Sequence, residues 1–202
     1  MRTNTLDTTV PEWSHRERAA ASAKLMLGWV ALLWLIELID LAAGHALDLY
    51  GIRPREADGL IGIPLAPFLH FGFGHVAGNS LPLLVLGFVT ALSGIRRFLA
   101  VCLLVIAADG LGVWLISPAH SVTIGASGLI YGLFGFLLVR GFVERKVLGI
   151  AVGIAVAAYY GGGMFLGLLP LNPLVSWQAH LCGLAAGVAT ALWYRRPEPR
   201  LS

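Results

Sequence analysis

The chain alternates between long apolar runs and short polar connections. An α-helix needs about 20 mostly apolar residues to cross a bilayer, and six runs approach or exceed that length. The pattern predicts an all-α membrane protein with six transmembrane helices in one domain over residues 25–194, flanked by polar tails over 1–24 and 195–202. The predicted spans are Leu25–Leu47, Val76–Leu92, Phe98–Ile116, Ile124–Val139, Val147–Leu168 and Trp177–Tyr194.

Composition supports a membrane location. Hydrophobic residues make up 57% of the 202 residues, charged residues only 12%, and the mean hydropathy is +0.80. Soluble domains carry about 25% charged residues, so a compact soluble enzyme and a disordered chain are excluded. Cys102 and Cys182 lie inside apolar runs, which predicts two small buried thiols and no disulfide framework.

The basic residues predict the orientation. Twelve of the fourteen Lys and Arg residues fall in the two tails and in the connections after the second and fourth spans. Only Arg53 and Arg55 fall on the other side. Positively charged loops stay in the cytoplasm, so both termini are predicted to be cytoplasmic, and we expect the plasma membrane as the location. This topology accounts for the net charge of +3 without a nucleic-acid partner.

With that orientation, the second, fourth and sixth spans begin at the outer face, and polar residues gather at all three starts. A serine hydroxyl becomes a nucleophile when a neutral imidazole accepts its proton. The resulting oxyanion needs fixed donors, which His, Asn and backbone N–H groups supply. The groups in question are His75 and Asn79, then Gly125, Ser127, Gly128 and Tyr131, and finally His180.

Each of these residues also has a purely structural interpretation. Ser127 can serve close helix packing, since small residues are frequent where membrane helices touch. His180 can be a buried histidine bonded to a backbone carbonyl, and the pair His75 and Asn79 can close hydrogen bonds at a helix entry. Tyr131 can simply fill space. Their occurrence together at one depth favours chemistry over these alternatives.

The order His-x3-Asn, then Gly-x-Ser-Gly with a tyrosine four residues after the serine, then Ala-His-x2-Gly resembles the rhomboid intramembrane serine proteases. The resemblance implies a rhomboid-like six-helix bundle in which Ser127 is the nucleophile and His180 the general base. It further implies that His75, Asn79 and the Ser127 backbone N–H form the oxyanion hole. Tyr131 then stacks on the His180 ring, and Gly125 leaves room beside the serine.

Several other residues bear on this hypothesis. Tyr131 lies one helical turn after Ser127 and is placed to hold the imidazole in place of a carboxylate. Asp109 is the one buried carboxylate that competes as a third catalytic member, but we expect a helix contact below the level of the serine. His70, His75 and His180 lack the further motif of a metalloprotease, so no metal and no cofactor is expected. Glu37 and Asp40 receive no chemical role.

The segment 48–74 is predicted to be a structured loop lying partly in the outer leaflet. Rhomboids commonly carry a Trp-Arg pair there, and this sequence lacks it. That difference concerns the packing of the loop rather than the dyad. By the same resemblance, His70 supports the loop, and the fifth span with Gly161, Gly162 and Gly163 suits a lateral gate. A bent helix with a short outer loop explains the same glycines.

The expected function is intramembrane cleavage of transmembrane protein substrates near the outer leaflet. The first alternative is a catalytically inactive rhomboid-like protein that binds membrane helices without cutting them. A small transporter or channel is the second alternative, suggested by the acidic residues Glu37, Asp40 and Asp109 inside spans. Those acids show no paired pathway across the membrane.

Overall fold

The computed structural model describes residues 13–194, and their regular structure is helical. The long helices are α1 (His15–Ala42), α3 (Phe73–Ala91), α4 (Ile95–Ile116), α5 (Ser127–Val143), α6 (Val147–Gly167) and α7 (Trp177–Trp193). Four short turns separate α1 from α3, namely η1 (Leu47–Tyr50), η2 (Asp58–Ile61), α2 (Gly62–Leu65) and η3 (Ala66–Phe68). Between residues 13 and 194 no strand forms, and Ile52 and Thr123 make an isolated bridge.

Each long helix occupies one of the predicted apolar runs. By length and composition, α1, α3, α4 and α6 can each cross a membrane, and α5 is a shorter apolar helix of 17 residues. The predicted segment 48–74 is structured, as expected, because four short helical turns fill it. Cys102 and Cys182 are free thiols, in agreement with the prediction that they form no disulfide.

The two predicted boundaries of the first span were wrong, each for a local reason. The first helix begins at His15 rather than Leu25, because Ser14 and Glu17 form a capping box that starts the helix inside the predicted tail. It ends at Ala42 rather than Leu47, since Gly44 and His45 have left-handed φ angles of 67° and 64°. The other long helices begin and end within four residues of the predicted spans; α5, for example, begins at Ser127 rather than Ile124. The remainder of the predicted tails, 1–12 and 195–202, lies outside the described residues.

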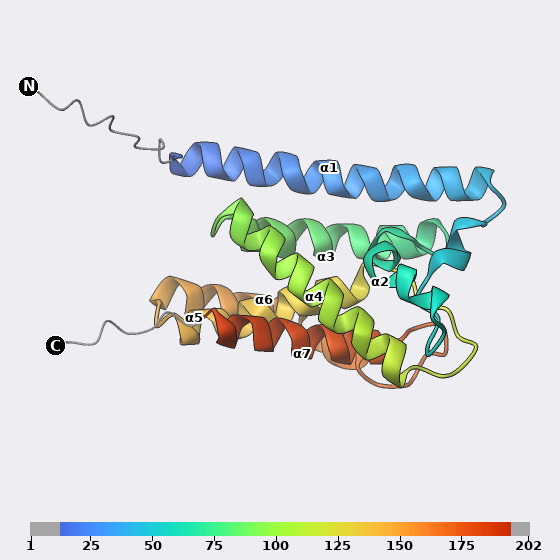
Figure 1. The fold of residues 1–202 in the computed structure, drawn as a ribbon. Helices are drawn as coiled ribbons and strands as arrows, with labels where there is room; N and C mark the ends of the chain where they lie inside the picture. Colours follow the sequence, from blue (N-terminus) through green and yellow to red (C-terminus); the bar gives the residue numbers. More distant parts are fainter. Residues whose placement is uncertain (1–12, 195–202) are drawn as a thin grey trace, which may run out of the picture.

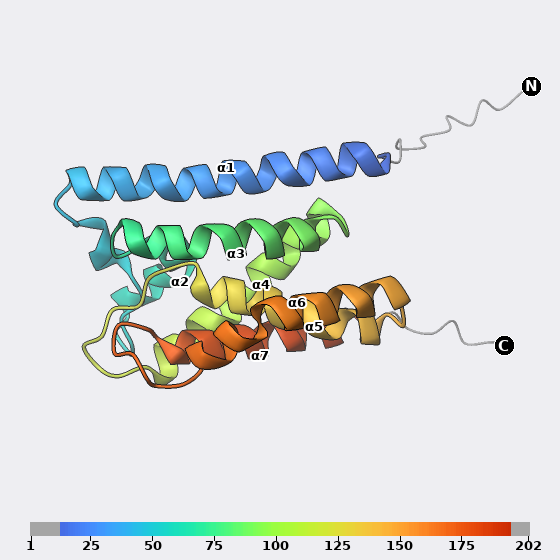
Figure 2. The same ribbon diagram turned by 180° about the vertical axis from the view of Figure 1, so that it is seen from behind.

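The helices form layers that place three loop regions together. Figure 1 shows α1 above α3, with α5, α6 and α7 below and α4 crossing obliquely between them, and Figure 2 shows the same order from behind. The start of α1 and the end of α7 lie at one end of the bundle. The connections 43–72, 117–126 and 168–176 lie at the other end, which we call the loop end.

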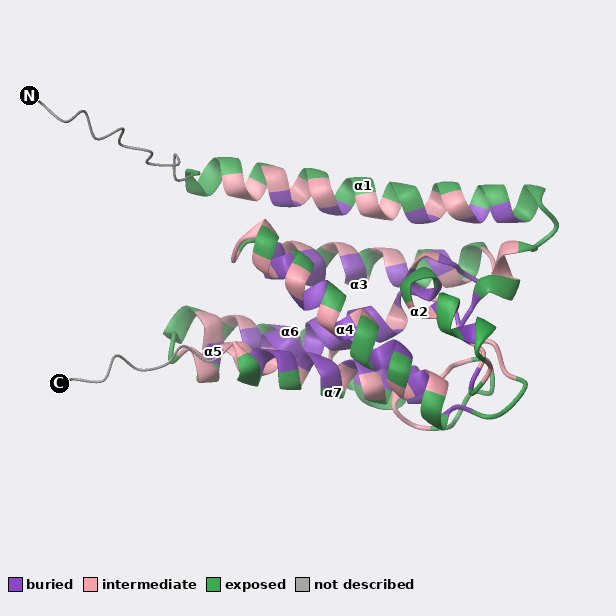
Figure 3. Ribbon diagram, in the orientation of Figure 1, coloured by how far each residue is buried: buried purple, intermediate pink, exposed green. Residues whose placement is uncertain are grey.

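Helix α5 is the centre of the bundle. Eleven of its seventeen residues are buried, whereas side chains of α6 such as Tyr159 and Phe165 are largely exposed. Figure 3 colours the ribbon by burial, with buried residues in purple. Glycines allow α7 to approach α5 very closely: a Cβ at Gly183 would overlap the Gly128 carbonyl oxygen, and one at Gly187 would overlap that of Gly132. This small-residue contact brings the starts of α5 and α7 side by side.

Candidate active site

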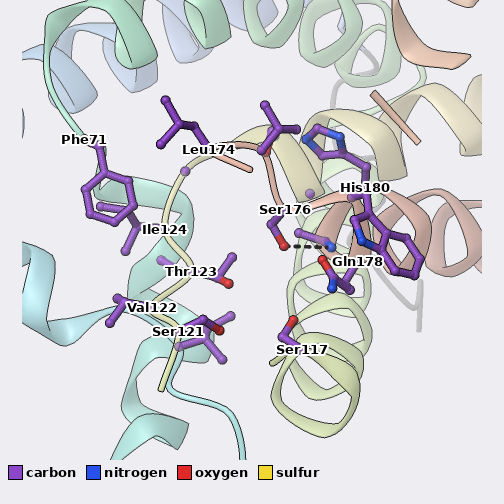
Figure 4. A pocket seen from close by; sticks show the side chains of 18 of the residues that line it. Phe71, Ser117, Ser121, Val122, Thr123, Ile124, Leu174, Ser176, Gln178 and His180 are labelled. Atoms are coloured by element: carbon purple, nitrogen blue, oxygen red, sulfur yellow. Dashed lines mark hydrogen bonds between the residues drawn. The ribbon is translucent and has the colours of Figure 1, made fainter. Parts of the chain in front are cut away.

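The three groups of polar residues singled out in the sequence meet at the loop end. Ser127 is the first residue of α5, His180 lies in the first turn of α7, and His75 and Asn79 lie in the first two turns of α3. All four line a cavity of about 800 Å³. Figure 4 shows this cavity with Ser176, Gln178 and His180 on one side and Phe71, Val122 and Ile124 on the other.

A smaller cavity reaches the same serine and histidine from another direction. It has a volume of about 270 Å³ and is lined by Asn79, Ser127 and His180 together with residues of α6, including Tyr160 and Gly163. It therefore lies where α3, α5, α6 and α7 meet. Ser127 and His180 thus line both cavities.

The hydrogen bonding of His180 defines its protonation. Its Nδ1 lies 2.7 Å from the carbonyl oxygen of Gly167, at the end of α6. A carbonyl oxygen only accepts, so Nδ1 carries the proton and donates it, and in the neutral ring Nε2 keeps a free lone pair. A buried structural histidine makes the same bond to a carbonyl, so this bond alone does not assign chemistry. What distinguishes His180 is that its ring lines a cavity shared with Ser127.

Tyr131 holds the other face of the imidazole. Its ring lies parallel to that of His180, with centroids 4.0 Å apart and an angle of 7° between the planes. The tyrosine hydroxyl donates to the carbonyl oxygen of Met164 at 2.9 Å. This is the stacked arrangement that the family resemblance implied. The ring of His180 is thus oriented by a stacked aromatic and a backbone carbonyl, in the position where a triad would use a carboxylate.

Gly167 was missed by the sequence reasoning. Its carbonyl orients His180, and a Cβ at this position would overlap the Tyr131 hydroxyl and lie 3.0 Å from His180 Nδ1. The only local signal is a glycine next to the predicted end of the fifth span. Its partners come from α5 and α7, so the sequence does not show what it contacts.

His75 presents a donor toward the start of α5. Its Nδ1 accepts a hydrogen bond of 3.2 Å from the Phe71 N–H, so Nε2 carries the proton in the neutral ring. That nitrogen would lie 2.7 Å from a Cβ at Gly125, which has a φ of 120°. Only glycine satisfies both the backbone conformation and the closeness of the imidazole. The imidazole edge therefore lies beside the backbone that leads into Ser127.

Asn79 and the start of α5 supply further donors. The Asn79 Nδ2 donates to the His75 carbonyl oxygen at 3.1 Å, which is the helix-entry bond that the structural interpretation predicted. The second N–H of this amide group remains for another acceptor. The N–H groups of Ser127 and Gly128 belong to the first turn of α5, where helices leave donors unpaired and carry positive partial charge. The site thus combines side-chain and backbone donors.

His70 supports this arrangement from the short connection between η3 and α3. It is 2% exposed, its Nε2 accepts a weak hydrogen bond of 3.4 Å from the Ala126 N–H, and its ring packs edge-on against His75 at 5.0 Å. Burial, and then the charge of His75, lowers the pKa of His70 to about 4. His70 is therefore a neutral structural residue at physiological pH, which agrees with the supporting role inferred for it.

Asp109 makes a helix contact, as expected. Its carboxylate fills the space beside Gly128, the residue after Ser127 in α5. It also lines the larger cavity. Its Oδ1 is buried without a hydrogen-bond partner among residues 13–194. The close approach of this carboxylate explains why position 128 requires glycine.

Comparisons with known proteins identify the family of this chain. The model of the Rhomboid domain matches residues 58–197, which is more than half of the chain. Uncharacterized proteins of Mycobacterium bovis and Mycobacterium tuberculosis are each 43% identical over 199 residues, covering 95% of this chain and 82% of each relative. A Bacillus subtilis protein named "Putative rhomboid protease YdcA" is 31% identical over 126 residues, or 59% of each chain. This chain is a multi-pass membrane protein and belongs to the rhomboid family.

Proposed function

We propose that this protein is an intramembrane serine endopeptidase with Ser127 as nucleophile and His180 as general base and acid. The observation that carries the proposal is the 2.7 Å contact between His180 Nδ1 and the Gly167 carbonyl oxygen. The His180 Nδ1–H is held by the Gly167 carbonyl, which leaves Nε2 as the proton acceptor in a cavity that Ser127 also lines. No metal or organic cofactor enters the proposed reaction.

In the proposed mechanism, Ser127 Oγ attacks the scissile carbonyl carbon while its proton passes to His180 Nε2. The oxyanion receives hydrogen bonds from His75 Nε2–H, Asn79 Nδ2 and the Ser127 N–H. The tetrahedral intermediate collapses when His180 protonates the leaving amine. Water then attacks the acyl-enzyme with His180 again as base, which releases the acid product and restores Ser127.

The proposed substrate is a transmembrane helix of another protein. The smaller cavity lies between α3 and α6 and reaches both Ser127 and His180, so we propose that an unwound substrate segment enters there. Three consecutive glycines of α6, at positions 161–163, have no neighbour within 4 Å of an added Cβ, which fits a helix able to shift. In this proposal all six long helices span the plasma membrane, both termini are cytoplasmic and the loop end faces outward.

The test compares purified wild-type protein with Ser127→Ala and His180→Ala variants on a panel of single-span reporter substrates. Both variants are expected to fold and to lose cleavage. Labelling of the wild type, but not of Ser127→Ala, by a fluorophosphonate probe would exclude an inactive rhomboid-like binding protein. Retained cleavage in Ser127→Ala would refute the proposal.

A further inference from the structure

A cluster of ionisable side chains lies at the loop end of α1, apart from the residues that line the two cavities. Asp40 is in the last turn of α1, His45 follows the helix end, and Asp48 is in η1. His45 Nδ1 lies 3.2 Å from Asp40 Oδ2 and 3.9 Å from Asp48 Oδ2. One ligand atom from each residue lies within 4.8 Å of the other two.

These separations approach those of a tetrahedral metal site. Zinc binds imidazole nitrogen and carboxylate oxygen at about 2.0–2.2 Å, which separates neighbouring ligand atoms by about 3.3–3.6 Å. The two His45–carboxylate distances lie on either side of that range. A small contraction of the Asp48 side chain would therefore close three ligands around one cation. The fourth position would remain open to water.

Glu37 provides an independent sign of missing positive charge. It lies one turn before Asp40 on the same face of α1 and is 2% exposed. Its carboxylate accepts a backbone hydrogen bond from Gly72, but its Oε2 is buried without a hydrogen-bond partner among residues 13–194. The carboxylate also interacts electrostatically with Asp40, Asp48 and His45. A buried carboxylate is costly unless a cation neutralises its charge. One imidazole, even when protonated, balances only one of the three carboxylates.

Asp48 likewise has a carboxylate oxygen without a partner. Its Oδ1 is also buried without a partner in the described part of the chain. The two unpaired oxygens therefore belong to carboxylates that interact electrostatically at this one cluster.

The backbone holds the potential ligands in place. Asp40 Oδ1 accepts from the Leu47 N–H at 2.7 Å, and the His45 N–H donates to the Asp40 carbonyl oxygen at 2.8 Å. His45 adopts a left-handed φ of 64°. The turn places the imidazole beside both aspartates.

We propose that Asp40, His45 and Asp48 bind a divalent transition-metal cation, Zn²⁺ being the ion that fits this mixed nitrogen and oxygen set. Glu37 contributes its negative charge from the buried side. A calcium site would use oxygen ligands alone, so the imidazole favours a transition metal. The bound cation would tie the end of α1 to η1, the first turn of the loop that leads to His70. This proposal does not depend on proteolytic activity.

The test uses the full chain, purified in detergent and freed of metal with a chelator. Isothermal titration with Zn²⁺ is expected to show saturable binding of one ion that His45→Gly and Asp48→Asn each weaken at least tenfold, with a rise in Tm in the wild type only. Glycine suits the left-handed conformation of position 45, so His45→Gly is expected to fold. The matched control is His120→Gly, since His120 is an exposed loop histidine with a φ of 62°.

A measurement on the wild type keeps the test independent of the variants. Co²⁺ is expected to produce the visible absorption of a tetrahedral nitrogen and oxygen site, which Zn²⁺ then removes. Equal Zn²⁺ affinity in wild type and His45→Gly would overturn the proposal. Absence of the cobalt absorption would overturn it as well, and so would Ca²⁺ binding that exceeds Zn²⁺ binding and is unaffected by His45→Gly.

Discussion

Replacing Gly167 by alanine perturbs the two contacts that orient His180 without touching Ser127. The new Cβ would overlap the Tyr131 hydroxyl and lie 3.0 Å from His180 Nδ1, where ordinary contact is 3.4–4 Å. The tyrosine must therefore retreat, which weakens its hydrogen bond to the Met164 carbonyl and displaces the stacked ring from His180. The hydrogen bond from His180 Nδ1 to the Gly167 carbonyl is disturbed at the same time.

The expected loss is large for so small a change. A displacement of a reacting group by about 1 Å costs on the order of 10²-fold in rate. Loss of the tyrosine hydrogen bond adds about 1 kcal/mol of destabilisation. We therefore expect kcat for a transmembrane reporter to fall by roughly 10²-fold, with little change in KM, because the substrate path is not altered.

The matched control is Gly28→Ala in α1, which lines neither cavity. A Cβ at Gly28 meets nothing within 4 Å, so this variant is expected to keep wild-type kcat and to gain up to about 1 kcal/mol from the higher helix propensity of alanine. The assay measures kcat and KM in proteoliposomes together with the rate of fluorophosphonate labelling. Wild-type kcat in Gly167→Ala, or an equal loss in both variants, would refute the role assigned to Gly167.

Three further predictions follow from the site. Asp109→Asn is expected to keep kcat within about tenfold, because His180 is oriented by Gly167; a loss near 10⁴-fold, as in a triad, would contradict the dyad. Folding lowers the pKa of His70 from 6.5 to about 4, so on acidification the unfolded chain takes up a proton before the folded chain does. The contribution of His70 to the free energy of unfolding is therefore fully present above pH 6.5 and falls by about 3 kcal/mol as the pH is lowered to 4. Thermal unfolding of wild type and His70→Gln across this range measures the effect, and an identical pH dependence in both would contradict it. Gly163→Leu, which has open space for its side chain, is expected to slow cleavage of transmembrane substrates while leaving fluorophosphonate labelling intact; unchanged cleavage would argue against entry between α3 and α6.

The sequence by itself determined where the long helices lie and which polar residues begin them. Apolar runs and their neighbouring residues are local properties, so the pattern placed α3, α4, α6 and α7 within a few residues of their observed bounds. The spacing of Ser127 and Tyr131 by one turn likewise predicted that both lie on one face of α5. Where local capping decided the outcome, as at Ser14 and at Gly44, the hydrophobic pattern alone gave the wrong boundary.

Only the tertiary structure decided which partners the polar groups find. The carbonyl that sets the tautomer of His180 comes from the end of α6, and the N–H that sets that of His75 comes from the preceding loop. Asp109 reaches Gly128 because α4 crosses the bundle obliquely, and Glu37 meets Asp48 because the chain reverses after α1. Helix crossing angles and chain reversals depend on packing between distant segments, so hydrophobic periodicity does not predict these contacts.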